Sequence, residues 1–110
     1  MVSYGEITVE ELAALGPDAR IVDVREDDEW SAGHIPWAVH VPLATVPEQL
    51  ASFDGAPTYV ICKVGGRSAH ACEFAAAREL DVVNVLGGML AWERAGFDVV
   101  DGSDADRRGG

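Results

Sequence analysis

The segment spanning residues 58–68 constrains the fold of this 110-residue chain more than any other. Strand-forming residues fill positions 58–61, Cys62 and a glycine-bearing loop follow directly, and an alanine-rich stretch with a helical pattern comes next. This order predicts that Cys62 lies at the carboxyl end of a buried strand and that a helix begins just beyond the loop. Ligands of parallel α/β sheets bind at that edge, so the segment is also the strongest candidate for a functional site.

The composition of the loop favours a reactive thiolate. Gly65 and Gly66 allow successive backbone N–H groups to turn inward, and the N-terminus of the following helix adds partial positive charge. Together with Arg67 and Lys63, this environment is expected to lower the pKa of the Cys62 thiol. The alternative is a buried structural thiol, an interpretation that the glycines and the arginine after Cys62 disfavour.

The rest of the chain alternates between helical and strand patterns. Helical patterns cover residues 8–15, 26–32, 45–53, 68–80 and 89–95, strand patterns cover 20–24, 39–41, 58–61 and 82–86, and an extended ending covers 97–100. Thr8 with Glu11 and Thr45 with Glu48 have capping-box spacing, so each threonine is expected to begin a helix. The alternation predicts an α/β domain with a mainly parallel central sheet of about five strands, flanked by helices on both faces.

Length and charge limit the classes of protein that fit. We expect one domain over residues 1–100, followed by a polar, glycine-bearing tail over 101–110 that is disordered. Eight basic and 19 acidic residues give a formal net charge of −11, which argues against nucleic-acid binding and against docking on anionic membranes. The only lysine, Lys63, lies in the cysteine loop, so the loop reverses the sign of the charge locally.

The cysteines and the N-terminal residues indicate a cytoplasmic protein. Cys62 and Cys72 are too few for a secreted disulfide framework, the first six residues lack the regions of a signal peptide, and no apolar run approaches membrane-spanning length. A reducing compartment also suits a free thiol. The histidines and cysteines have no zinc-ligand spacing, and we expect neither a metal nor a cofactor.

Four stretches resemble the rhodanese domain, and they occur in that family's order and spacing. They are residues 21–25 with Glu29-Trp30, residues 33–38, residues 62–68, and residues 86–92 with Gly96. Each stretch alone is a weak to moderate signal, but jointly they are specific. The chain departs from the family at two places. Trp37 stands where a glycine is usual, which we interpret as a packing substitution, and residues 78–81 lack the glycine usual in the turn after the long helix.

The resemblance implies an enzyme of the thiosulfate sulfurtransferase type. Cys62 would accept a sulfane sulfur from a small donor such as thiosulfate or a persulfide, become a persulfide, and pass the sulfur to a thiophilic acceptor. That acceptor would be a thiol, cyanide or a protein. Inward N–H groups would stabilise the thiolate and the persulfide without a histidine base. The substrate-binding residues are then expected to be Lys63, Val64, Gly65, Gly66, Arg67 and Ser68.

Loop length separates sulfur transfer from phosphatase chemistry. Four residues lie between Cys62 and Arg67, whereas the related cell-cycle phosphatases have five, and a shorter ring of N–H groups fits a sulfur atom better than a phosphoryl group. Two further functions stay open. One is a rhodanese-like binding or regulatory module with low turnover. The second is a redox-sensing protein that uses Cys72, although Cys72 is better explained as filling the core.

Several residues outside the loop have structural interpretations. Asp23 and Arg25 follow a strand, and a structural ion pair is the favoured role for Arg25. His34 is expected to be a hydrogen-bonded loop residue, Trp92 a core anchor, and the other two histidines have no expected role. Arg67 has two interpretations, anion binding or pairing with a nearby acid.

Overall fold

The computed structural model describes residues 4–55 and 57–101, so the predicted disorder of the tail concerns residues that lie almost entirely outside the described part. The strands are β1 (Gly5–Ile7), β2 (Arg20–Asp23), β3 (Val39–His40), β4 (Thr58–Ile61) and β5 (Val82–Val85). The α-helices are α1 (Val9–Leu15), α2 (Asp27–Ala32), α3 (Gly66–Ala76) and α4 (Gly88–Arg94). Short 3-10 helices cover Gly16–Asp18, Leu43–Glu48 and Leu50–Phe53.

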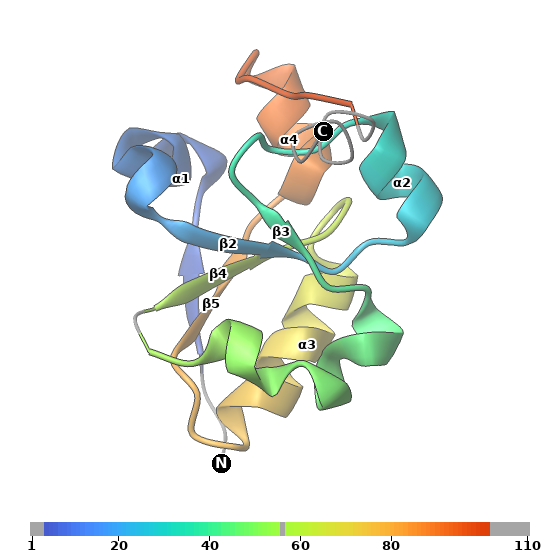
Figure 1. Ribbon diagram of the computed structural model, residues 1–110. Coiled ribbons are helices and arrows are strands. Elements are labelled where there is room, and N and C mark those ends of the chain that lie inside the picture. Colours follow the sequence, from blue (N-terminus) through green and yellow to red (C-terminus); the bar gives the residue numbers. More distant parts are fainter. Residues whose placement is uncertain (1–3, 56, 102–110) are drawn as a thin grey trace.

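The strands form one parallel sheet in the order β1-β5-β4-β2-β3 (Figure 1). In this register Asp23 pairs with Ile61 on one side and with His40 on the other. The carboxyl ends of β2, β3 and β4 therefore meet at one edge, where Cys62 follows β4. The predicted parallel sheet of about five strands is confirmed.

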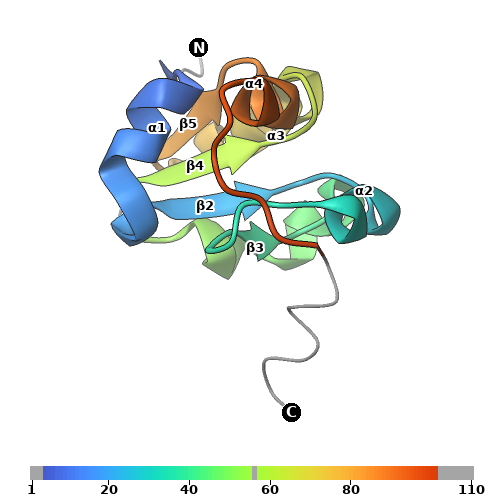
Figure 2. The same cartoon turned by 90° about the horizontal axis from the view of Figure 1, so that it is seen from above.

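Helices cover both faces of the sheet, as predicted (Figures 1 and 2). Successive residues of each strand point to opposite faces, so the apolar strands supply two cores. The core beneath α3 contains Val22, Val24, Val41, Val46, Phe53, Val60, Ala71, Cys72 and Ala75. The core beneath α1 and α4 contains Val9, Leu12, Ile21, Ile35, Ile61, Val85, Met89 and Trp92.

The first helix begins as its capping-box spacing predicts. Thr8 Oγ1 accepts a hydrogen bond from the backbone N–H of Glu11 at 3.1 Å, and Thr8 N donates to Glu11 Oε1 at 3.0 Å. These two bonds satisfy N–H groups that have no partner within the helix. The predicted short helix near residues 26–32 is α2, which ends at Ala32 with Gly33 as its C-cap, as expected.

The predicted helix over residues 45–53 is wrong. Two 3-10 helices occupy this region instead, and Thr45 Oγ1 donates to the carbonyl of Pro42 at 2.8 Å rather than capping an α-helix. Pro47 lies inside the first of them. Because proline lacks an N–H and clashes with the preceding turn, it prevents a continuous α-helix at this point.

The helix after the cysteine loop also differs from its predicted bounds. α3 begins at Gly66 and ends at Ala76, not at residue 80. Beyond it, Glu79 has a φ of 64°, and it is the only described non-glycine residue with a positive φ. The turn that lacks the family's usual glycine therefore places a glutamate in the left-handed conformation.

The first strand of the domain was not expected from the sequence, whereas the extended ending was. β1 has no counterpart among the predicted strands, yet it forms a sheet edge through its pairing with β5. The extended ending at residues 97–100 contributes only an isolated antiparallel bridge between Val100 and His34. Among the described residues, no helix has the length and apolar character required to cross a membrane.

Candidate active site

A short loop connects β4 to α3 (Figure 1). Cys62 follows directly after β4, and only 1% of its surface is exposed. Gly65, which precedes the first residue of α3, has a φ of 117° that L side chains rarely adopt. This conformation turns the chain into the helix, and Gly65 N donates to Cys62 Sγ at 3.1 Å. The predicted strand–loop–helix arrangement around Cys62 is thus observed.

The first turn of α4 forms hydrogen bonds with the backbone of the cysteine loop. Met89 N donates to the carbonyl of Cys62 at 2.8 Å, and Leu90 N donates to the carbonyl of Lys63 at 3.0 Å. These bonds need a close approach, because a β-carbon on Gly88 would lie 2.4 Å from Cys62 O. With these carbonyls bound by α4, backbone N–H groups remain to face the sulfur.

Hydrogen bonds to the sulfur favour the thiolate. Burial alone raises the pKa of the Cys62 thiol. The Ser68 side chain, followed by the backbone N–H groups of Ser68, Gly65 and Val64, outweighs burial and brings the pKa below its ordinary value. The geometry therefore agrees with the expectation of an activated thiol, and no imidazole is required to activate it.

Arg67 forms an ion pair with Glu29 of α2. Its two terminal nitrogens donate to Glu29 Oε1 and Oε2 at 2.6 and 2.8 Å, which makes a bidentate ion pair. The hydrogen bond from Arg67 lowers the pKa of Glu29 to about 2, and Glu29 in turn raises the pKa of Arg67. The pairing with an acid is thus observed, whereas substrate binding by Arg67 stays a prediction.

Asp23 and Arg25 form the ion pair favoured from the sequence. Arg25 Nη2 lies 2.8 Å from Asp23 Oδ2, and both residues are buried. The same nitrogen donates to the carbonyl of Gly33 at 2.7 Å, which ties the end of β2 to the end of α2. This pair supports the edge of the sheet beside Cys62.

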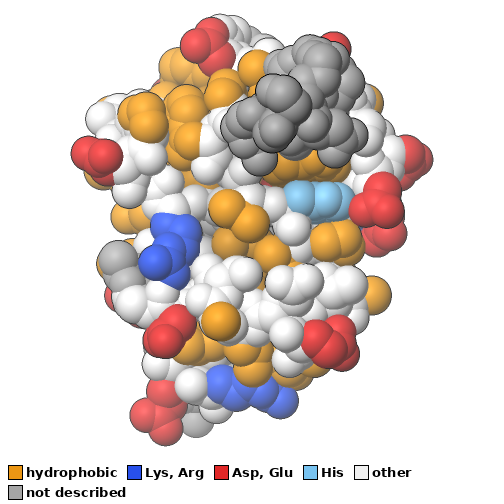
Figure 3. Space-filling view, in the orientation of Figure 1, with side chains coloured by type: hydrophobic (Ala, Val, Ile, Leu, Met, Phe, Trp, Pro, Cys, Tyr) orange, Lys and Arg blue, Asp and Glu red, His pale blue; other side chains and the backbone are white. Residues whose placement is uncertain are grey.

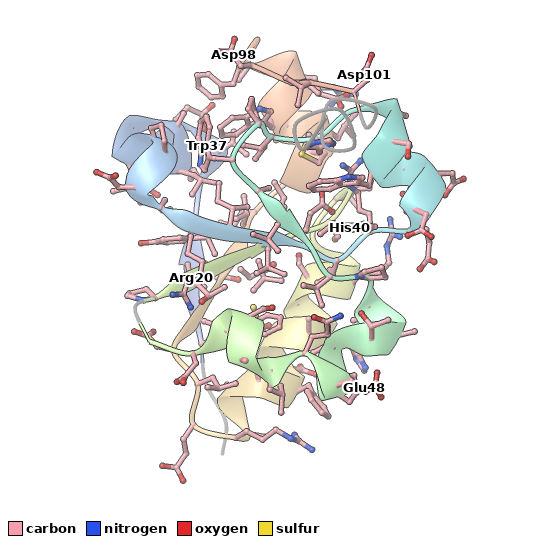
Figure 4. All side chains as sticks on the ribbon, viewed as in Figure 1. Arg20, Trp37, His40, Glu48, Asp98 and Asp101 are labelled. Atoms are coloured by element: carbon pink, nitrogen blue, oxygen red, sulfur yellow. The ribbon has the colours of Figure 1, made fainter. Side chains whose placement is uncertain are left out.

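Aromatic stacking also positions α2. The Trp30 ring stacks with both His34 and His40, at centroid distances of 3.5 and 4.7 Å and with nearly parallel planes. His34 Nδ1 is 2.9 Å from the carbonyl of Trp30, which confirms the predicted hydrogen-bonded loop residue. His40, labelled in Figure 4, stacks on α2 and bonds the carbonyl of Arg25 at 2.8 Å, a role not expected from the sequence.

The expected core residues lie in the core. Trp92 is buried, and Trp37, labelled in Figure 4, meets it edge-on at a centroid distance of 6.1 Å. This contact agrees with the packing interpretation of Trp37. Cys72 is fully buried on α3, and burial, with the charge of Cys62 as a second cause, raises the pKa of its thiol to about 12. Cys72 therefore lies in the core, as expected, and its raised pKa disfavours the thiolate.

Two surface hollows border the loop. One, of about 360 Å³, is lined by Lys63 together with Arg25, Glu29 and Met89. The other, of about 490 Å³, is lined by Val64 with Gly87 and Leu90, and Val64 is 59% exposed. Lys63 and Val64 thus face solvent on the loop that follows Cys62, while Ser68 is buried beside the sulfur.

Two residues near the site are absent from the predicted set. Glu29 holds Arg67, and Asn84 of β5 lies beside Ser68. The signal for Asn84 is its position, because a polar residue stands inside the otherwise apolar run of β5. Buried polar side chains are hydrogen-bonded as a rule, so such a residue indicates a specific partner. Within residues 4–55 and 57–101, no group of three His, Cys, Asp or Glu residues is arranged to hold a metal ion.

The fold and the site define a parallel α/β domain with an activated cysteine at the carboxyl edge of its sheet. The chain belongs to the rhodanese-like domain family, whose model matches residues 8–95.

Similar proteins include sulfurtransferases. The "Putative sulfurtransferase YtwF" of Bacillus subtilis is 43% identical over 74 residues, which is 66% of this chain and 72% of that protein. The thiosulfate sulfurtransferase GlpE of Pseudomonas entomophila is 30% identical over 95 residues, 84% of this chain and 87% of that protein. The crystal structure of a rhodanese-related protein from Thermoplasma volcanium has a TM-score of 0.83 at 32% identity and covers 88% of this chain and 98% of the other.

Proposed function

We propose that the protein is a sulfurtransferase that carries a sulfane sulfur on Cys62. The observation that carries the proposal is the pair of hydrogen-bond donors at the Cys62 sulfur. The backbone nitrogen of Gly65 lies 3.1 Å from the sulfur, and the hydroxyl of Ser68 lies 3.4 Å from it. These donors favour a negative charge on the sulfur. Both the attacking thiolate and the persulfide it becomes carry that charge.

The transfer takes place in two steps, with thiosulfate as the test donor. The Cys62 thiolate attacks the outer sulfur of thiosulfate, the sulfur–sulfur bond of the donor breaks, and sulfite leaves with the electron pair. Cys62 is then a persulfide anion. A nucleophilic acceptor, cyanide or a thiolate, next attacks the outer sulfur of this persulfide. The sulfur–sulfur bond on Cys62 breaks and the thiolate is restored, so no external oxidant or reductant is needed.

The exposed loop residues support access by more than one kind of acceptor. Lys63 and Val64 are exposed on the loop that follows Cys62, and each lines a surface hollow. A small anion would approach Lys63, whereas the apolar Val64 offers contact to a protein thiol. We therefore propose thiols, including protein thiols, as acceptors beside the test acceptor cyanide.

Intact-protein mass spectrometry tests the proposal. Treatment with thiosulfate should add one sulfur atom, cyanide should remove it, and Cys62→Ser should show no addition. Cys72→Ala is the matched control, because Cys72 is buried in the core, and it should still gain the sulfur. Absence of added sulfur on the unmodified protein, or the same addition on Cys62→Ser, would overturn the proposal.

A further inference from the structure

The hydroxyl group of Ser68 has one hydrogen and three acceptors around it. Ser68 Oγ lies 3.4 Å from Cys62 Sγ, 3.1 Å from the carbonyl of Gly65 and 2.5 Å from Asn84 Oδ1. Ser68 is fully buried in the first turn of α3. A hydroxyl group donates one hydrogen, so Ser68 does not donate to the sulfur while it donates to Asn84, which is the shortest of these contacts.

The side-chain amide of Asn84 determines which acceptor receives the Ser68 hydrogen. Asn84 is only 4% exposed, and in the sheet it pairs with Val60 of β4, two residues before Cys62. Besides the contact with Ser68, its Nδ2 lies 3.4 Å from the carbonyl of Gly65. A primary amide holds a donor and an acceptor on one planar group, and a half-turn of that group exchanges them. Asn84 is therefore able to accept from Ser68 or to donate to it.

We propose that Asn84 is a positioning residue that acts on Cys62 through Ser68. With a neutral thiol, the Ser68 hydroxyl donates to Asn84 Oδ1, and the amide donates to Gly65. When the sulfur is anionic, the Asn84 amide turns and donates to Ser68 Oγ, and the Ser68 hydroxyl donates to the sulfur. The proposal for the thiolate does not depend on the proposed function. Only its extension to the persulfide rests on that function.

The change moves no proton between Asn84, Ser68 and Cys62. The proton of the thiol leaves to solvent, and the serine hydrogen stays on its own oxygen while the hydroxyl rotates. Turning the amide gives up its weak 3.4 Å bond to Gly65. In return, the sulfur gains a hydrogen bond to a charged acceptor, and such bonds are about twice as strong as neutral ones.

The test measures the pKa of the Cys62 thiol without any sulfur donor. The rate of iodoacetamide alkylation at Cys62 is followed against pH by peptide mass spectrometry, which separates Cys62 from Cys72. Asn84→Asp keeps the shape of the side chain but replaces the donor by an acceptor that holds the Ser68 hydrogen. The variant should raise the pKa of Cys62 by about one unit, which reduces the thiolate fraction about tenfold at any pH well below the pKa.

A second pair of variants separates action through Ser68 from a direct charge effect. Ser68→Ala removes the hydroxyl, and Asn84→Asp in that background should raise the pKa of Cys62 clearly less than it does alone. An unchanged pKa in Asn84→Asp, or equal shifts in both backgrounds, would overturn the proposal. The charged residues beside the loop, Lys63 and Arg67 with its partner Glu29, are the same in all variants.

A third variant, Asn84→Ala, distinguishes the proposed role of Asn84 from a purely structural one. It removes the competing acceptor without adding charge and leaves the Ser68 hydroxyl free to face the sulfur. We expect a lower melting temperature but a pKa of Cys62 much closer to that of the unmodified protein than in Asn84→Asp. If Asn84→Ala instead raises the pKa as much as Asn84→Asp, the proposal is wrong. Because these measurements use no sulfur donor, their outcome is independent of persulfide formation.

Discussion

Glu79 lies between α3 and β5 with a φ of 64°, in the region that favours glycine. A residue with a β-carbon is destabilised by about 1–2 kcal/mol in this conformation. Glycine removes this cost, but it also raises the conformational entropy of the unfolded chain, which offsets part of the gain in stability. Glu79→Gly should therefore raise the free energy of unfolding by about 0.5–1 kcal/mol.

Urea denaturation measures the effect. Glu79→Ala is the matched control: it removes the same carboxylate but keeps a β-carbon, so it should give little or no gain. Equal stabilisation by both variants would assign the effect to charge rather than to backbone conformation.

At the scale of elements, the pair between Glu29 and Arg67 connects α2 to α3 beside the site. The pKa of Glu29 is lowered to about 2 from its ordinary value of 4.5. A lowered pKa means that the pair stabilises the fold above the unfolded value, and that this contribution disappears as pH falls through the folded value. The connection is therefore present at neutral pH and lost in acid.

Glu29→Gln should lower the free energy of unfolding at pH 7 by about 1 kcal/mol, a modest figure because both side chains are partly exposed. Denaturation at a series of pH values should show this difference shrinking between about pH 5 and about pH 2. The exposed Glu48→Gln serves as a control and should show no such convergence. A difference that stays constant down to about pH 2 would contradict the assignment to the ion pair.

Predictions from the sequence were best where neighbouring residues alone decide the structure. The strand before Cys62, the glycine-bearing loop and the capping box at Thr8 all follow from short-range patterns, and the structure shows each of them. The helix expected at Thr45 is wrong because capping-box spacing does not outweigh Pro47 inside the same segment. β1 consists of three residues and owes its conformation to β5, a partner far along the chain.

The candidate site also combines residues that are contiguous in sequence with residues that come from distant elements. Cys62 and its loop are contiguous, so their arrangement could be predicted from one segment. Glu29 and Asn84 reach the loop from α2 and β5, and only the folded chain brings them there. A buried asparagine in an apolar strand is nevertheless a signal that could be used.

At the scale of the whole molecule, the protein carries a large negative net charge, whereas the proposed donor is itself an anion. The net charge is −11, and acidic side chains are spread over the face in Figure 3 rather than gathered in one patch. Long-range repulsion should therefore slow the approach of an anionic donor, and salt should screen it.

Persulfide formation with thiosulfate should become at least about twofold faster as NaCl increases from about 10 mM to about 150 mM. Alkylation of Cys62 by the neutral iodoacetamide is the control and should change little over the same range. A rate with thiosulfate that falls with salt would show that the positive charge of Lys63 and its neighbours outweighs the net charge of the protein.

The bonds from Met89 and Leu90 to the carbonyls of Cys62 and Lys63 have a consequence for synthesis of the protein. A growing chain that has reached only β5 already contains Cys62, but it lacks the N-terminal turn of α4 that orients the loop. The α4 contacts that hold the loop therefore form late, when nearly the whole domain has left the ribosome. A truncated product would carry the same cysteine without these two hydrogen bonds to its loop.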